Sequence, residues 1–293
     1  MKFYNRQLSH LSRLLLFFAI AFSSCVKEDD EEQNALDAAT LKTEIHNQIK
    51  NHNAKSYSYL WTAFRSTDVK PTGKVNDLYD NSTNYTFGAD QDKGGGDANK
   101  YNREHSFPKS WFGVSDSYNI PDDRYAIHND LFHLYPSDTE ANGKRSNLPY
   151  GKVNKGTPNW ENGYCKLGNM VSAGFSGLVF EPNDAIKGNL ARTYFYIATR
   201  YEDANFSKWG GSEMITKTSY PFFRTWAINM LLEWNRLDPV DAAERKRNDE
   251  VAKIQGKRNP YIDDPELAEY IWGEKMGQSY KMTRITMPIA IYR

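Results

Sequence analysis

The amino-acid sequence predicts an α+β fold, in which a short strand–loop–helix segment is packed among several longer helices. Apolar residues recur at helical spacing before residue 65 and again in several stretches after residue 187, which is typical of amphipathic helices. Between these stretches, residues 101–107 are predicted to form a strand that Pro108 closes. The length of 293 residues suits one large domain or two closely packed ones.

The first 25 residues are predicted to be a lipoprotein signal peptide and not part of the fold. Basic residues precede an apolar run at 14–22. The run is about nine residues long, which suits a secretion signal and is roughly half the length of a membrane-spanning helix. Two serines then precede Cys25, and this end of the segment resembles a bacterial lipoprotein signal, whose cysteine is lipidated. An ordinary cleaved signal peptide is the alternative.

Residues 26–35 are predicted to be an acidic tether, because the adjacent carboxylates at 28–32 cannot pack together. An acidic run directly after a lipidated cysteine also resembles the surface-export signals of some Gram-negative lipoproteins. The predicted location is therefore the outer membrane or the cell surface, through a lipid anchor at Cys25. Secretion or the periplasm is the alternative. The remaining residues, 36–293, are predicted to form the folded domain.

The charge balance excludes a protein that binds nucleic acid through its overall positive charge. The whole chain has 37 basic and 37 acidic residues. Because three basic residues lie in the signal segment, the mature chain has a net charge of about −3. Any surface that binds anions must therefore be local.

The elements before residue 100 are predicted from apolar spacing and from breaker residues. Apolar residues at helical spacing predict a helix over roughly 36–50 and a second helix over 57–64. Residues 66–100 are polar and are interrupted by proline and glycine, so they are predicted to be loops. Short strands are expected within them around 75–79 and 85–87.

The later elements are mostly helical. Ser137 and Glu140 have the spacing of a capping box and predict a short helix that carries Asn142. The last predicted helix begins with Asp264 as its N-cap and Pro265 at its first position. The longer helices of this part are predicted at about 188–201, 222–236, 241–256 and 265–273.

Three short blocks carry residue types that suit the hydrolysis of a phosphodiester. Such a reaction needs a base that takes a proton from water near neutral pH, and histidine suits this best. It also needs a hard divalent cation, which carboxylate and amide oxygens hold. The blocks are Glu104-His105 with Pro108, the segment from Asp130 to Pro136, and Asn142 with Arg145-Ser146-Asn147.

Each block is weak when it is taken alone. Neighbouring residues on a strand point to opposite faces, so Glu104 and His105 can serve one phosphate only if the strand bends or ends there. Asn142 alone is typical of an exposed helix residue, and His133 of a buried core histidine.

Together, the blocks resemble the secreted endonuclease I family of bacterial nucleases, which belongs to the ββα-metal (His-Me finger) superfamily. The family pattern is a Glu-His pair followed by a proline, then D-x-H-x-L-x-P, then an asparagine three residues before R-x-N. Further matches extend the resemblance over roughly 55–275. They lie at 191–196, 234–240 and 255–267.

The resemblance implies a ββα-metal core at about 101–150, packed among the longer helices, and a role for each site residue. His105 would be the general base, and Glu104 and Asn142 would hold Mg²⁺, with Mn²⁺ or Ca²⁺ as alternatives. Arg124 or Arg145 would contact the phosphate, and the sequence does not decide between them. The protein would be a monomeric endonuclease that cleaves DNA, with RNA as a second substrate, and leaves 5′-phosphate and 3′-hydroxyl ends.

One departure from the family pattern concerns the second block. Phe132 stands where family members often have histidine, and His133 is its neighbour. If the family's histidine only supports the fold, Phe132 is tolerable. If that histidine orients the site, activity is reduced.

A basic stretch near the C-terminus has two interpretations. It could contact the phosphate backbone, which every nucleic-acid sequence presents alike, or it could be an exposed helix face balanced by neighbouring acids. No base-reading module is recognised in the sequence, so non-specific cleavage is predicted. The stretch contains Arg245, Lys246, Arg247, Lys253, Lys257 and Arg258.

Two other functions remain as alternatives. One is a non-catalytic surface lipoprotein that binds nucleic acid on a degenerate nuclease fold, against which the intact Glu104, His105 and Asn142 argue. The other is a phosphodiesterase that uses a histidine-bound zinc, which is weaker because the histidines lack the paired spacing of zinc ligands.

Overall fold

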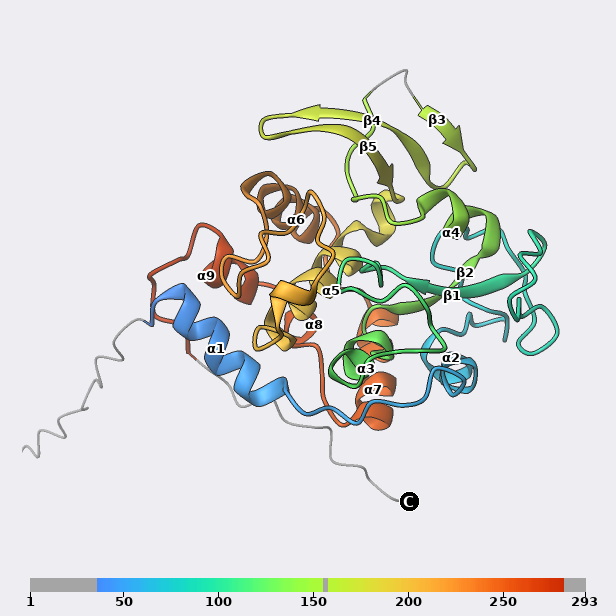
Figure 1. Ribbon diagram of the computed structural model, residues 1–293, viewed down its shortest axis with the longest axis horizontal. Helices are drawn as coiled ribbons and strands as arrows, with labels where there is room; N and C mark the ends of the chain where they lie inside the picture. Colours follow the sequence, from blue (N-terminus) through green and yellow to red (C-terminus); the bar gives the residue numbers. More distant parts are fainter. Residues whose placement is uncertain (1–35, 155–157, 282–293) are drawn as a thin grey trace, which may run out of the picture. The chain divides into compact units, whose positions relative to one another are not determined.

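The computed structural model describes residues 36–154 and 158–281 (Figure 1). The predictions of a signal peptide, a lipidated Cys25 and an acidic tether lie outside the described residues. In the part that is described, no helix is long and apolar enough to cross a membrane.

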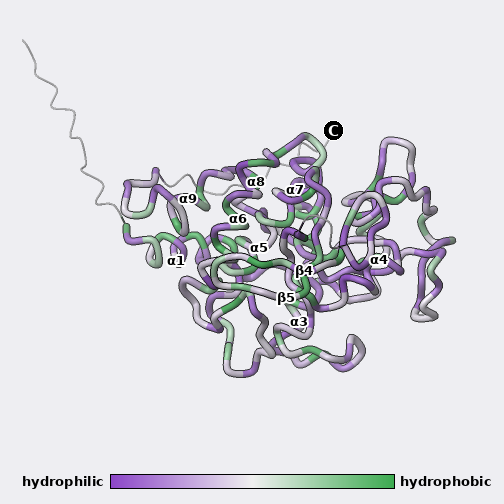
Figure 2. Tube along the Cα trace, turned by 90° about the horizontal axis from the view of Figure 1, so that it is seen from above, coloured by the Kyte–Doolittle hydropathy of each residue, from purple (hydrophilic) through white to green (hydrophobic). Residues whose placement is uncertain are grey.

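A central helix, α5 (Lys187–Arg200), organises the helical part of the fold. Nearly all of its side chains are buried, as expected for a helix that is surrounded by other elements. It packs against α1 (Ala38–Ile49), α6 (Thr225–Leu237) and α8 (Pro260–Asp263) (Figure 1). Helix α9 (Leu267–Trp272) in turn packs against α1 and α6. Figure 2 shows the more hydrophobic stretches of the trace around α5 and α6, and hydrophilic stretches on the outer loops.

A two-stranded antiparallel ribbon followed by a helix lies beside this helical part. Strand β1 (Tyr101–His105) pairs with β2 (Leu134–Asp138), and α4 (Thr139–Arg145) packs against both strands. The predicted α+β fold with a ββα core is therefore confirmed. Helix α3 (Asp122–His128) lies in the connection between the two strands.

The remaining elements surround this core. Helix α2 (Leu60–Thr67) packs against α7 (Ala242–Gln255). A separate antiparallel sheet, whose strand order is β3-β4-β5, was not predicted from the sequence. Its strands are β3 (Pro158–Glu161), β4 (Lys166–Ser172) and β5 (Phe175–Glu181), and short 3₁₀ helices η1 and η2 cover Asp184–Ile186 and Phe206–Lys208.

Several predicted boundaries are wrong. Residues 75–79 and 85–87 are loops and not strands, although Val75 forms an isolated bridge with Val69. The N-cap of α4 is Asp138 and not Ser137, because the Asp138 carboxylate accepts a hydrogen bond from the backbone N–H of Ala141 at 2.8 Å.

The predicted first residues of the last helix are also wrong. The prediction used Asp264 and Pro265, but α9 begins only at Leu267. The structure uses an equivalent pair earlier: Asn259 caps α8, and Pro260 occupies its first turn. The predicted helices at 36–50, 188–201, 222–236, 241–256 and 265–273 are confirmed within a few residues.

Candidate active site

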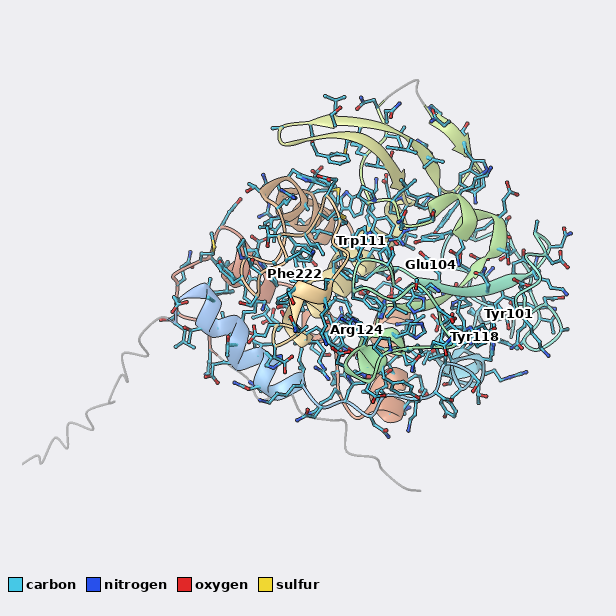
Figure 3. The ribbon with its side chains drawn as sticks, in the orientation of Figure 1. Tyr101, Glu104, Trp111, Tyr118, Arg124 and Phe222 are labelled. Carbon is cyan, nitrogen blue, oxygen red and sulfur yellow. The ribbon has the colours of Figure 1, made fainter. Side chains whose placement is uncertain are left out.

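A pocket of about 360 Å³ opens at the end of β1, where Glu104 lies (Figure 3). Strand β1, the loop that follows it and the end of α4 supply most of the lining, and Tyr57 and Ser117 come from other loops. The lining residues are Tyr57, Arg103, Glu104, His105, Pro108, Lys109, Ser110, Ser117, Asn142, Ser146 and Asn147.

The end of β1 explains how Glu104 and His105 can share this pocket. Glu104 pairs with Tyr135 and His105 with Leu134, and His105 is the last residue of the strand. Because the strand ends there, the alternation of faces does not separate the two side chains, and both line the pocket. The three predicted residues Glu104, His105 and Asn142 are therefore brought together.

Asn142 reaches the pocket from α4 by contacting β1. Its Nδ2 donates a hydrogen bond to Oδ1 of Asn102 at 2.5 Å. Asn102 and Glu104 are two residues apart on the strand and share one face. Since the amide nitrogen of Asn142 is used in this bond, its Oδ1 is the atom available as a ligand.

The Glu104 carboxylate is 3% exposed and is held at one of its oxygens. The Tyr79 hydroxyl donates to Oε1 at 2.9 Å, and Arg145 Nη1 lies 3.4 Å from the same atom. Burial raises the pKa of Glu104, and the positive charge of Arg145 opposes this rise. In the part of the chain that the structure describes, no side chain donates a hydrogen bond to Oε2, so this oxygen can accept a cation.

Arg145 is fully buried beneath the pocket and does not line it. Its guanidinium donates to the backbone carbonyls of His105, at 3.1 Å, and of Ser106, and to the Tyr194 hydroxyl at 3.2 Å. These contacts fix the chain at the end of β1. Arg145 therefore acts on the site through Glu104 and this backbone.

Arg124 also lies outside the pocket lining (Figure 3). It belongs to α3, is 8% exposed and pairs with Asp123 at 2.8 Å. Neither of the two arginines that the sequence offered for the phosphate thus faces the pocket.

The hydrogen bond of His105 fixes which of its ring nitrogens carries the proton. Nε2 lies 2.9 Å from the backbone carbonyl of His128. A carbonyl only accepts hydrogen bonds, so Nε2 carries the proton and Nδ1 keeps its lone pair. Tyr57 stacks on the imidazole, with 5.9 Å between ring centroids. Among the described residues, Nδ1 has no hydrogen-bond partner.

The surroundings of His105 keep its ring neutral. Burial lowers the pKa of His105 well below its usual value, and the neighbouring rings of His128 and His133 lower it further. These rings lie 4.6 Å and 5.4 Å from that of His105. A neutral imidazole with an available lone pair can accept a proton from water at neutral pH.

Phe132 places no side chain in the pocket. It is 1% exposed and packs against Tyr196, with 4.6 Å between ring centroids. His133, its neighbour, turns the other way, towards His105, and its Nε2 bonds to the Ile127 carbonyl at 2.5 Å. The side chain at position 132 is therefore a core side chain.

The donor set of the pocket suits a hard cation. Glu104 and Asn142 offer oxygen atoms, and Mg²⁺ is commonly bound by one or two such side chains while it keeps several waters. No group of three or more His, Cys, Asp or Glu side chains in the described part of the chain could hold a metal.

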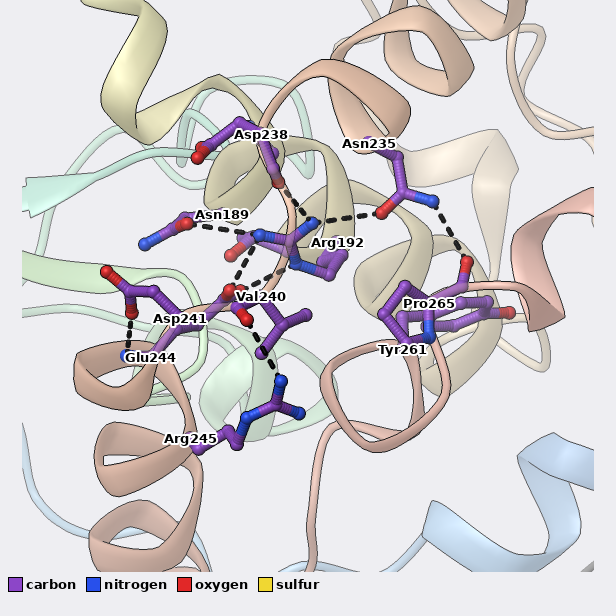
Figure 4. A network of polar contacts seen from close by, with 12 residues as sticks. Asn189, Arg192, Asn235, Asp238, Val240, Asp241, Glu244, Arg245, Tyr261 and Pro265 are labelled. Atoms are coloured by element: carbon purple, nitrogen blue, oxygen red, sulfur yellow. Dashed lines mark hydrogen bonds and ion pairs between the residues drawn. The ribbon is translucent and has the colours of Figure 1, made fainter.

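The basic stretch at the C-terminal end is largely used inside the protein. Arg247 pairs with Asp68 at 2.8 Å, and Arg258 pairs with Asp249 and Asp263. Figure 4 shows that Arg245 donates to the Val240 carbonyl, beside a network in which Arg192 binds Glu244. These contacts favour the interpretation as a structural surface.

Sequence reasoning missed several residues of the pocket. Arg103 and Lys109 directly flank the first block but received no role, although two cations beside a candidate base are a recognisable signal. Tyr57 was assigned to the second helix, but α2 begins at Leu60 and Tyr57 lies in the preceding loop. The backbone carbonyl of His128, which fixes the proton on Nε2 of His105, has no signature in the sequence.

Several known proteins are similar in sequence to this chain over half of its length or more. The family model of endonuclease I matches residues 37–266. An extracellular ribonuclease of Bacillus subtilis (strain 168) is 34% identical over 239 residues, which cover 80% of this chain and 74% of the relative. An extracellular ribonuclease of Bacillus amyloliquefaciens is 32% identical over 250 residues, which cover 83% and 77%. An extracellular deoxyribonuclease of Aeromonas hydrophila is 27% identical over 151 residues, which cover 52% and 53%. The chain therefore belongs to the endonuclease I family, and it is an enzyme that hydrolyses nucleic acid.

Proposed function

We propose that this protein is a Mg²⁺-dependent endonuclease that cleaves DNA and RNA without sequence specificity. The observation that carries the proposal is the pocket at the end of β1. Glu104, His105 and Asn142 line it together, and the hydrogen bond to the His128 carbonyl leaves Nδ1 of His105 available as a base.

In the proposed reaction, Nδ1 of His105 takes a proton from a water molecule, and the oxygen of that water attacks the phosphorus atom. The bond between phosphorus and the 3′ oxygen breaks, and the departing oxygen takes a proton from solvent water, which leaves a 5′-phosphate and a 3′-hydroxyl end. Glu104 and Asn142 would hold the cation. When bound, it supplies positive charge for the phosphate oxygens and the departing oxygen. Arg145 keeps Glu104 in place through its contact with Oε1.

The range of substrates is supported by the relatives and by the character of the pocket. Two relatives that cover most of the chain are named ribonucleases, and the Aeromonas relative is named a deoxyribonuclease. The lining supplies mainly charged and polar side chains, which suit contacts to the phosphates and sugars that every sequence presents alike. We therefore propose that backbone contacts dominate binding.

The proposed location is outside the cytoplasm. Relatives are named extracellular or periplasmic nucleases. The apolar segment before Cys25 favours export, and we propose that a lipid on Cys25 anchors a monomer to the outer membrane or the cell surface.

Cleavage assays test the proposed function. Protein that lacks residues 1–25 is incubated with plasmid DNA and with RNA, in Mg²⁺ and in Mg²⁺ with excess chelator. We expect both substrates to be cut only when Mg²⁺ is available, and the His105→Ala variant to be inactive but folded. Absence of any cleavage by the wild-type chain would refute the proposal, and unchanged activity of His105→Ala would remove its base.

A further inference from the structure

We propose that Arg103 and Lys109 bind backbone phosphates of the nucleic acid next to the reacting one. The cationic contacts of the site would then come from β1 and the loop that follows it. This inference rests on the proposed function, since it assumes that nucleic acid enters the pocket described above.

Arg103 is held in the pocket by two aromatic rings. Its guanidinium carbon lies 3.5 Å from the centroid of Tyr57 and 4.6 Å from that of Trp61. Nη1 donates to the backbone carbonyl of Tyr57 at 2.7 Å. Guanidinium groups stack on aromatic faces in this way, and such stacking fixes their orientation.

The remaining donors of Arg103 point to an anionic ligand. Among the described residues, no carboxylate lies within ion-pair distance of Arg103, and only Nη1 makes a hydrogen bond. A planar guanidinium with several unused N–H groups matches the oxygens of a phosphate. Because the Tyr57 ring contacts both Arg103 and His105, this cation stands beside the base.

Lys109 supplies the second cation of the pocket. Nζ donates to the Ser117 hydroxyl at 2.9 Å. Burial lowers the pKa of Lys109, and the negative charge of Asp116 partly offsets this, although Asp116 forms no ion pair with it. The Asp116 carboxylate instead accepts the backbone N–H of Tyr118 at 2.8 Å and Nδ2 of Asn119 at 2.5 Å. Lys109 therefore keeps donors for a phosphate.

The other candidate cations are already neutralised. Arg145 is fully buried against Glu104, Arg124 pairs with Asp123, and Arg247 pairs with Asp68. In the pocket lining, by contrast, Glu104 is the single carboxylate beside Arg103 and Lys109. The place where a phosphate must enter therefore carries the local positive charge that the near-neutral chain lacks overall.

Binding of nucleic acid, measured without cleavage, tests this inference. The full chain in detergent carries His105→Ala, and fluorescence anisotropy follows a labelled duplex over a series of salt concentrations. Each lost phosphate contact should reduce the slope of log affinity against log salt by about 0.9. We expect Arg103→Gln and Lys109→Gln each to lower the slope by about this amount and to weaken binding about tenfold. The double variant should lose about twice as much slope.

Matched controls separate a local contact from a change in total charge. Arg236→Gln and Lys253→Gln remove the same charges from exposed ion pairs on α6 and α7, and their slopes should stay at the parent value. Arg103→Lys should keep the slope, because the charge remains, and lose part of the affinity. Thermal unfolding of each variant identifies any loss of fold.

The outcomes distinguish this inference from the proposed function. If Arg103→Gln and Lys109→Gln are folded and keep the parent slope, the inference is overturned, whether or not the wild-type chain cleaves. If the wild-type chain does not cleave but the two variants lose slope, the phosphate contacts stand and the proposed hydrolysis of these substrates fails.

Discussion

Replacing Arg145 tests whether this residue supports the fold or contacts substrate. The Arg145→Met change removes a fully buried cation that lies 3.4 Å from the Glu104 carboxylate. It also leaves the carbonyls of His105 and Ser106 without this donor. Removing one partner of a buried ion pair costs about 3–5 kcal/mol, because the other charge stays buried without compensation.

The assay is equilibrium unfolding in urea at neutral pH. We expect the free energy of unfolding of Arg145→Met to fall by about 3–5 kcal/mol. The exposed pair of Arg236 with Glu269 provides the control, and Arg236→Met should cost about 1 kcal/mol or less. Adding Glu104→Gln to Arg145→Met should recover part of the loss, because the buried charge is then also removed.

One result would refute this reasoning. If Arg145→Met unfolds within about 1 kcal/mol of the wild-type chain but no longer binds nucleic acid, Arg145 contacts phosphate after all. The guanidinium would then have to move out of its buried position when substrate binds.

Three further predictions concern the metal site, the pH dependence of stability and position 132. Tyr79→Phe removes the hydroxyl that donates to Oε1 of Glu104. The Mg²⁺ concentration for half-maximal cleavage should therefore rise about tenfold or more. An unchanged concentration in a metal titration would contradict this role of Tyr79. Burial raises the pKa of Asp77 from 3.8 to about 7, so this group stabilises the fold below pH 4 and the contribution is lost as pH rises through 7. The loss amounts to roughly 4 kcal/mol, and urea unfolding of Asp77→Asn should show a flatter dependence between pH 4 and 7. Phe132→His should leave kcat within about threefold of the wild-type value, because position 132 lies in the core. It should lower the free energy of unfolding by about 1–3 kcal/mol, because it buries a polar ring against Tyr196. A large gain in kcat would show that position 132 orients the site.

The sequence was sufficient to predict the helices that bury one regular face. The periodicity of α1 and α6 survives in the structure, since each packs a mainly apolar stripe on the core, whereas three of the five buried residues of α7 are polar. The strands predicted at 75–79 and 85–87 do not form, because side-chain hydrogen bonds hold this part of the chain in loops. The Asp77 carboxylate, for example, accepts hydrogen bonds from two backbone N–H groups.

The candidate site was predictable where a side chain has a chemical signature. Glu104, His105 and Asn142 lie together as the three blocks suggested. The choice between Arg124 and Arg145 could not be made, because burial depends on the packing of segments far apart in the chain. For Arg145 these segments are β1 and α5, which supply the His105 carbonyl and the Tyr194 hydroxyl.

Four consecutive residues of β1 supply the site, and this makes its geometry depend on one strand register. Asn102 holds Asn142, Arg103 is the proposed phosphate contact, and Glu104 and His105 are the proposed ligand and base. A slip of one residue against β2 would exchange the faces of all four at once. Deletions or insertions of one residue in β1 should therefore abolish activity completely, even where every side chain of the site is kept.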